Sequence, residues 1–164
     1  AARRRQGDLM ALLARIVNGE RHGRPAPELL PVDVGADLYV AAHPERLARV
    51  IGHLVKNAID ATPADGQVTV SAGLCGEGGR ECEVQVRDSG AGMSEEFMRE
   101  RLFRPFQSSK ASGMGIGVYE AQQYLKELGG SLRYASTPGE GTCATVRLPC
   151  VQRAEDKEGG KTDG

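Results

Sequence analysis

The sequence predicts an α+β fold, a two-layer α/β sandwich in which helices cover one face of a mixed, mostly antiparallel sheet. Three observations support this prediction. The chain has 164 residues, of which 40% are apolar, so one domain can bury a sizeable core. Amphipathic helical segments lie between the predicted strands. Most of those strands follow one another as hairpins, whereas a doubly wound fold would alternate strand and helix strictly.

The N-terminal segment is predicted to lead into the main domain. The apolar pattern at residues 9–17 indicates a short helix, and three prolines indicate a linker at residues 25–31. We therefore divide the chain into an N-terminal helix and linker (1–29), a central domain (30–149) and a tail (150–164). The tail is charged and rich in glycine, so we expect it to be disordered.

The strongest helical pattern begins at Pro44, a residue that suits the first position of a helix, with Glu45 beside it to complement the helix dipole. Thr62-Pro63 ends this helix, because the residue before a proline avoids helical geometry. Apolar residues at helical spacing predict its buried side: Leu47, Val50, Ile51, Leu54, Val55, Ala58 and Ile59.

The remaining elements are strands with alternating apolar residues and two further helices. One helix begins after Ser94, a good N-cap residue, and the other ends at a pair of glycines. The predicted elements are a strand at 37–40, strands at 67–72 and 81–88 joined by a hairpin loop, a short helix from Ser94, a helix at 118–128, and strands at 131–136 and 142–148.

Composition disfavours several classes of protein. A net charge of −1 argues against nucleic-acid binding, which needs a basic surface to neutralise phosphates. The four cysteines include no CxxC pair, which disfavours a zinc site and suits a reducing, cytoplasmic compartment. The longest apolar run is too short for a membrane-spanning helix. The 22 glycines and the scarcity of aromatic residues indicate backbone loops built around a ligand.

Asp88 is the first candidate for a functional residue. It continues the inward-facing parity of Val84 and Val86, so a carboxylate is expected at the end of an apolar strand face, where it needs hydrogen-bond donors. Gly90 and Gly92 follow and let the backbone approach a ligand closely. Such a carboxylate can accept a hydrogen bond from the exocyclic amine of adenine. Taken alone, the same residues are also good turn formers.

A second candidate is the glycine-rich loop before the helix at 118–128. It consists of Gly113, Met114, Gly115, Ile116 and Gly117. Free backbone N–H groups and a helix N-terminus attract phosphate, although such loops often serve only as turns. The loop is neither a P-loop nor a Rossmann fingerprint, since the P-loop lysine and the preceding strand are missing.

Polar residues form a stripe on the helix that begins at Pro44. An amide oxygen from Asn57 is a suitable ligand for Mg²⁺ that also touches phosphates. His53, one turn earlier, can contact phosphate or accept a proton, and Asp60 follows on the same side. A solvated helix face is the commoner explanation for His53 and Asp60 singly.

Two further residues complete the candidate site. Thr142 shares the parity of the inward-facing residues in the last strand, so we expect its hydroxyl near Asp88, with a polar ligand or water between them. Lys110, just before the glycine-rich loop, can reach a terminal phosphate, although a generic exposed lysine explains it equally well.

The motifs in this order resemble the ATP-binding catalytic domain of sensor histidine kinases. This domain belongs to the Bergerat-fold superfamily, which includes gyrase B, Hsp90 and MutL. The resemblance covers about residues 30–149, and its last motif and the FRPF motif favour the kinase branch; the segment from residue 113 to 131 is also similar to kinases of exosortase (PEP-CTERM) systems. The matching segments are HLVKNAIDAT (53–62), DSGAGM (88–93), FRPF (103–106), GMGIG (113–117) and GEGT (139–142).

The resemblance implies a role for each motif. Asn57 is expected to hold Mg²⁺, Asp88 to bind the adenine amine, and Thr142 to assist through water. Phe103 and Phe106 are expected to anchor a lid over the nucleotide. The residues implied to contact ATP are Asn57, Asp60, Asp88, Gly90, Gly92, Met93, Phe106, Lys110, Gly113, Met114, Gly115, Ile116, Gly117 and Thr142.

Two positions depart from the usual family pattern. His53 stands where most of these kinases have asparagine, so a phosphate or proton role for His53 is a hypothesis. Asp60 stands where many of these kinases have lysine. One phosphate contact is therefore either missing or supplied by Lys56 or Lys110. Gly23 and Pro25 disfavour a long helix around His22, and His43 precedes Pro44 as a helix-start residue, so we expect the phosphoacceptor histidine to lie in a separate, upstream domain.

The resemblance implies a kinase domain that transfers the γ-phosphoryl of Mg·ATP to a histidine on a separate dimerisation domain. The phosphoryl group would pass on to the receiver domain of a response regulator. The full-length protein is expected to be a homodimer anchored in a membrane, with this domain in the cytoplasm. Three alternatives remain: an ATPase that uses nucleotide as a conformational switch, a serine kinase similar to anti-sigma factors, and a nucleotide-binding module without catalysis.

Overall fold

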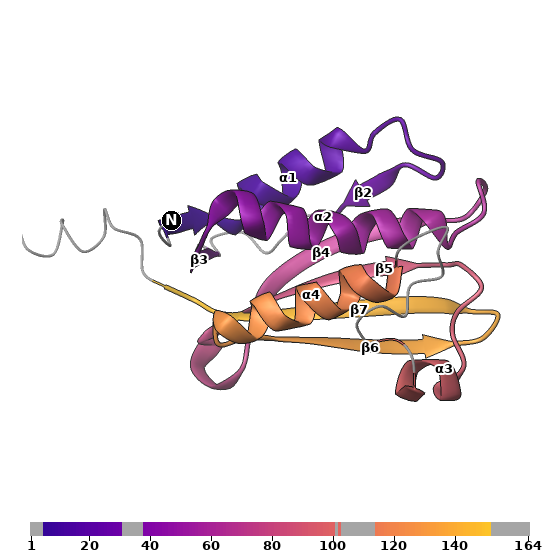
Figure 1. Ribbon diagram of the computed structural model, residues 1–164. Helices are drawn as coiled ribbons and strands as arrows, with labels where there is room; N and C mark the ends of the chain where they lie inside the picture. The colour runs from indigo at the N-terminus through magenta and orange to yellow at the C-terminus, as the bar shows by residue number, and fades with distance from the viewer. Residues whose placement is uncertain (1–4, 31–37, 101, 103–113, 152–164) are drawn as a thin grey trace, which may run out of the picture.

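A computed structural model describes residues 5–30, 38–100, 102 and 114–151. Helices α1, α2 and α4 lie over one face of a five-stranded sheet, so the chain forms two layers (Figure 1). The predicted two-layer α/β sandwich is therefore confirmed. The helices are α1 (Leu9–Gly19), α2 (Pro44–Asp60), α3 (Glu95–Glu100) and α4 (Met114–Glu127); the strands are β1 (Arg5–Asp8), β2 (Pro27–Leu29), β3 (Tyr39–Ala42), β4 (Val68–Cys75), β5 (Glu81–Asp88), β6 (Ser131–Thr137) and β7 (Gly141–Pro149).

The sheet has the strand order β2-β4-β5-β7-β6. Only β2 and β4 are parallel; the other neighbours are antiparallel, as expected for hairpins. The register places Val84 of β5 opposite Val146 of β7, and Asp88 opposite Thr142 at the end of the same pair. Strands β1 and β3 form a separate two-stranded sheet.

The core lies between the helices and the sheet. The predicted buried side of α2 is confirmed, and all seven of its apolar residues are buried. They pack with the inward-facing residues of β4, β5 and β7, including Val70, Val84 and Val146. At about 25 cal/mol per Å² of apolar surface, this shared burial is the main stabilising term of the fold.

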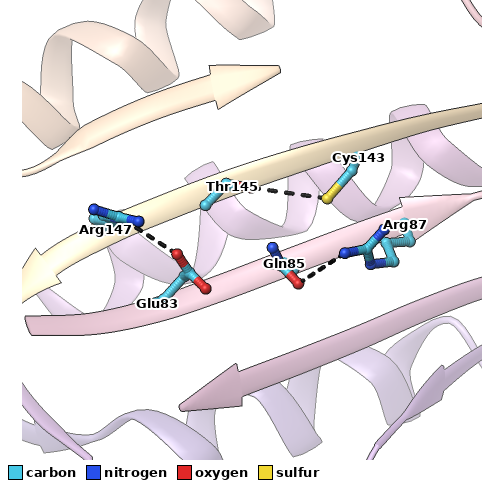
Figure 2. Close-up of polar contacts among 6 residues, drawn as sticks. All are labelled: Glu83, Gln85, Arg87, Cys143, Thr145 and Arg147. Carbon is cyan, nitrogen blue, oxygen red and sulfur yellow. Dashed lines mark hydrogen bonds and ion pairs between the residues drawn. The ribbon is translucent and has the colours of Figure 1, made fainter. Parts of the chain in front are cut away.

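The opposite face of the sheet is polar. Figure 2 shows Glu83 paired with Arg147 and Arg87 with Gln85 on this face. The Arg147 Nε to Glu83 Oε2 distance is 3.1 Å. Side chains alternate between the two faces of a strand, so this polar surface follows from the sequence alternation in β5 and β7.

The structure differs from the predictions at several element boundaries. The predicted linker at 25–31 contains strand β2, which pairs with β4, and the N-terminal strand β1 was not predicted. Helix α4 begins at Met114, four residues before the predicted start at Val118. Leu9 and Leu13 of α1 are buried in the same core as α2. The division of the chain at residues 29 and 30 stays a prediction, and the tail beyond Val151 lies outside the described residues.

Candidate functional site

A cavity of about 170 Å³ opens between α2 and the ends of β5, β6 and β7. Most of its wall is apolar, supplied by residues such as Leu54 and Ala144. Three polar residues predicted from the sequence line it together: Asn57, Asp88 and Thr142. The cavity therefore combines a mostly apolar wall with a few polar side chains, as small-molecule sites usually do.

The carboxylate of Asp88 is held by backbone groups at the floor of this cavity. The Gly90 N–H donates to its Oδ1 at 2.8 Å, and the Thr142 N–H also donates to the carboxylate. Burial raises the pKa of Asp88 above its ordinary value of 3.8, and these two N–H groups partly offset that rise. When ionised, Asp88 offers only acceptor oxygens to a ligand.

The loop after β5 packs closely against the turn between β6 and β7. Gly92 has φ +77°, and a side chain there would overlap the Thr137 carbonyl. The Gly139 N–H donates to the Ala91 carbonyl at 2.6 Å. Glycine is required at position 92 because both the conformation and the close approach exclude a Cβ atom. The cavity wall is thus fixed to the turn between β6 and β7.

Residues of α2 and α4 meet beside the cavity. Asn57 lines the cavity, and its Nδ2 atom is buried without a hydrogen-bond partner. His53, one turn earlier, lies against Gly117 of α4 in a second hollow of about 240 Å³, which Arg46 and Arg49 also line. The contact between His53 and the glycine-rich segment was not predicted from the sequence.

The predicted glycine-rich loop is partly helical. Residues 114–117 form the first turn of α4, whose leading N–H groups have no partner within the helix and can bind an anion. Gly113, Lys110, Phe103 and Phe106 lie outside the described residues. Asp60 is exposed at the end of α2 and lines neither of the two cavities.

Asn57 is the metal-ligand candidate that the structure places at the site. Among the described residues, no group of three or more His, Cys, Asp or Glu side chains could hold a metal ion. A Mg²⁺ ion bound at Asn57 would therefore need further ligands from phosphates and water, which is the common arrangement for this ion. The ligand to Mg²⁺ would be the Asn57 amide oxygen, because the Nδ2 group only donates hydrogen bonds and does not coordinate a cation.

Comparison with known proteins assigns the family. Residues 42–152 match the model of the family described as histidine kinase-, DNA gyrase B- and HSP90-like ATPases. The chain belongs to this family. The matched segment includes Asn57, Asp88 and Thr142, so the cavity lies within the part of the chain that defines these ATPases.

Curated relatives of this ATPase domain include sensor histidine kinases. The chain is 36% identical over 120 residues to the sensor histidine kinase ZraS of Klebsiella oxytoca, covering 73% of this chain and 25% of the relative. It is 37% identical over 121 residues to the histidine protein kinase DivJ of Caulobacter vibrioides, covering 70% and 19%. The chain thus spans a quarter or less of the length of these relatives.

Solved structures show the same fold as this ATPase domain. The catalytic domain of histidine kinase ThkA superposes with a TM-score of 0.74 at 23% identity, covering 90% of this chain and 95% of that one. The mycobacterial sensor histidine kinase MprB gives a TM-score of 0.71 at 23% identity, covering 92% of this chain and 99% of that one.

In the described part of this chain, no helix has the length and apolar character needed to cross a membrane.

Two residues at or beside the cavity were not predicted from the sequence. Tyr134 lines the cavity, and Ser136 lies next to it and hydrogen-bonds to the Thr142 hydroxyl at 2.8 Å. The turn between the last two strands could have revealed Ser136, since the register of that hairpin places it opposite Thr142. For Tyr134, the only indication in the sequence is the alternation of β6, which places it on the same face as Leu132.

Proposed function

We propose that this chain is the ATP-binding catalytic domain of a two-component sensor histidine kinase. The half-buried Asp88 carboxylate at the floor of the cavity is the observation on which the proposal rests. An acceptor in this place suits the exocyclic amine of adenine, while Leu54 and Ala144 offer apolar surface for the faces of the base. The relationship to ZraS and DivJ supports kinase activity rather than a conformational ATPase switch.

Different residues around the cavity would bind the base, the phosphates and the Mg²⁺ ion of Mg·ATP. Asp88 and Thr142 would hold the base, and the first turn of α4 would donate N–H groups to the phosphates. Asn57 would hold Mg²⁺, which neutralises phosphate charge during phosphoryl transfer. Lys110, Phe106 and Gly113 stay predictions for contacts to the nucleotide from the segment that precedes α4.

The proposed reaction moves the γ-phosphoryl group to a histidine on a separate dimerisation domain. An imidazole nitrogen of that histidine attacks the γ-phosphorus, the bond to the bridging oxygen breaks, and ADP leaves. His53 is exposed in the hollow beside Gly117, where its imidazole can contact a phosphate or take a proton from the attacking group. We further propose that the full-length kinase is a homodimer anchored in a membrane. It would pass the phosphoryl group from the histidine to the receiver domain of a response regulator.

Calorimetric titration with ADP tests the nucleotide site directly. We expect the wild-type protein to bind ADP more tightly with Mg²⁺ than without it, and Asp88→Asn to lose most of this binding. Asp65→Asn is the matched control because Asp65 is exposed and does not line the cavity. Folded wild-type protein that does not bind ADP would contradict the proposal.

Phosphoryl transfer separates the kinase from the alternatives. The protein is incubated with radiolabelled ATP and a separately supplied dimerisation domain, and the chemistry of the labelled residue is determined. Acid-labile label on histidine supports the proposal. Label on serine of a partner would indicate a serine kinase. ATP hydrolysis without transfer would indicate a conformational ATPase, and binding without turnover a nucleotide-binding module.

A further inference from the structure

We infer that Ser136 is a positioning and specificity residue, which turns the Thr142 hydroxyl so that its lone pairs face the nucleotide cavity. The inference rests on the proposed nucleotide site and adds a residue to it. Ser136 belongs to β6 and lies behind Thr142, directly opposite it in the pairing of β6 with β7.

Three hydrogen bonds converge on the Ser136 hydroxyl. The Met93 N–H lies 2.7 Å from Oγ, the Gly141 carbonyl oxygen 3.0 Å, and the Thr142 hydroxyl 2.8 Å. These partners come from the loop after β5 and from the start of β7. Ser136 therefore joins the two backbone segments that carry the polar end of the cavity.

The chemistry of the partners fixes the direction of each bond. A hydroxyl has one proton to donate and two lone pairs that accept. The Met93 N–H can only donate, so it occupies one lone pair of Ser136 Oγ. The Gly141 carbonyl can only accept, so it takes the Ser136 proton. The Thr142 hydroxyl must therefore donate its own proton to the second lone pair of Ser136.

In this arrangement, the Thr142 hydroxyl and the Asp88 carboxylate both offer only hydrogen-bond acceptors to the cavity. The Thr142 proton points toward Ser136, so the hydroxyl offers only lone pairs to the cavity that it lines. The Asp88 carboxylate beside it also only accepts when ionised, and both residues sit at the same register position of β5 and β7. At the 6-position of a purine, such a site favours an amino group, which donates, over an oxo group, which only accepts.

Loss of Ser136 should free the Thr142 proton. In Ser136→Ala the Thr142 hydroxyl can rotate and donate into the cavity, so a 6-oxo group becomes better tolerated. We expect ADP affinity to fall by about three- to tenfold, in line with the net contribution of a hydrogen bond. The preference for ADP over IDP should shrink by a similar factor, which a purely structural role would not produce.

The experiment measures ADP and IDP binding, with Mg²⁺, to five forms of the protein: wild type, Ser136→Ala, Ser136→Thr, Thr142→Val, and the Ser136→Ala/Thr142→Val double variant. Ser136→Thr keeps a hydroxyl and should restore the preference. In the Thr142→Val background, Ser136→Ala should leave the preference unchanged, because there is no hydroxyl left to turn. Ser131→Ala, at the far end of β6, is the matched control.

The outcomes distinguish this inference from the proposed function. If the wild type binds ADP and Ser136→Ala keeps the wild-type preference over IDP, the inference is wrong and the nucleotide site stands. An equal loss of preference on adding Ser136→Ala to Thr142→Val would also overturn it. If the folded wild type binds no ADP at all, the proposed function fails and this inference fails with it. Melting temperatures of all variants establish that each is folded.

Discussion

Gly90 lies directly against the backbone carbonyl of Ala61, so the loop after β5 touches the end of α2 with no room for a side chain between them. A Cβ atom on Gly90 would overlap that carbonyl oxygen and also lie 3.0 Å from Asp88 Oδ1. The contact brings the loop and α2 together around the cavity. It explains why a glycine follows Asp88 so closely in the sequence.

Gly90→Ala is therefore expected to damage both the fold and the site. The loop must move away from α2, and the N–H that donates to Asp88 moves with it. We expect the free energy of unfolding to fall by about 1–3 kcal/mol, as for other overpacked positions. Urea denaturation and ADP titration measure the two effects.

Gly73→Ala is the matched control for Gly90→Ala. Gly73 lies in β4, and a Cβ atom there would meet no other atom within 4 Å. We expect this variant to be as stable as the wild type and to bind ADP equally well. Comparable loss in both variants would mean that the contact with Ala61 is not what makes position 90 sensitive.

The raised pKa of Asp88 predicts that the charged carboxylate costs stability in the unliganded protein. Because burial raises its pKa above 3.8, the folded protein holds this proton more tightly than the unfolded chain does. The group therefore stabilises the fold at low pH, and that contribution is lost as pH rises through the folded pKa. Asp88→Asn cannot ionise, so we expect its stability relative to wild type to increase from about pH 3 to pH 7.

Thermal unfolding of both proteins across this pH range tests the sign. Other titrating groups are common to the two proteins and cancel in the difference. The same variant should bind ADP poorly at neutral pH, so the acceptor that suits the ligand is unfavourable to the empty fold. A stability difference that stays constant or shrinks with rising pH would contradict the assignment of Asp88 as a group with a raised pKa.

His43 occupies the N-cap of α2 without capping it. Its side chain makes no cap hydrogen bond, and its Nδ1 atom is buried without a partner. Aspartate at this position can accept from N–H groups of the first turn and complement the helix dipole. We expect His43→Asp to raise the free energy of unfolding by about 1 kcal/mol, measured by urea denaturation.

His43→Ala provides the reference for that gain. The His43 ring stacks on Tyr124 with a centroid distance of 6.4 Å, and both variants lose this contact. The backbone bond from the His43 N–H to the Tyr124 hydroxyl, 3.0 Å long, remains available to both. An aspartate variant no more stable than the alanine variant would show that the first turn of α2 needs no side-chain cap.

Periodicity predicted the helices and strands that form the core, because each has one buried and one exposed side. Helix α2 and strand β5 follow their patterns closely. Strand β2 was missed because it has three residues and begins with proline, which resembles a linker. It forms a strand because it lies at the sheet edge, where β4 supplies its hydrogen bonds.

The site could be predicted where its residues fall at strand ends or on one helix face. Parity placed Asp88 and Thr142 on the inward face, and the structure finds both lining one cavity. Ser136 acts behind Thr142, so only the cross-strand register could reveal it. The start of α4 was predicted too late because its glycines suggested a loop, whereas the structure has them in its first turn.

Cys82 and Cys150 are placed to form a disulfide under oxidising conditions. Their Sγ atoms lie 2.8 Å apart, and the Cys150 N–H donates to the Arg80 carbonyl, which holds the two chain segments together. With oxidised glutathione, one thiolate attacks the glutathione disulfide and releases a glutathione thiol. The second thiolate attacks the mixed disulfide and releases the other, so two electrons and the two thiol protons pass from the cysteines to glutathione.

We expect an internal disulfide whose formation speeds up as pH rises, because burial raises the pKa of the Cys82 thiol. The bond would close a loop between residues 68 positions apart, which in the chain-entropy model stabilises the fold by up to about 4 kcal/mol. Mass spectrometry of the oxidised chain measures the bond, and melting temperature its effect. Cys143→Ser should still form it, since Cys143 lies on the open sheet face beside Thr145 (Figure 2), whereas Cys150→Ser should not. A bridge through Cys75 or Cys143 instead would contradict the prediction.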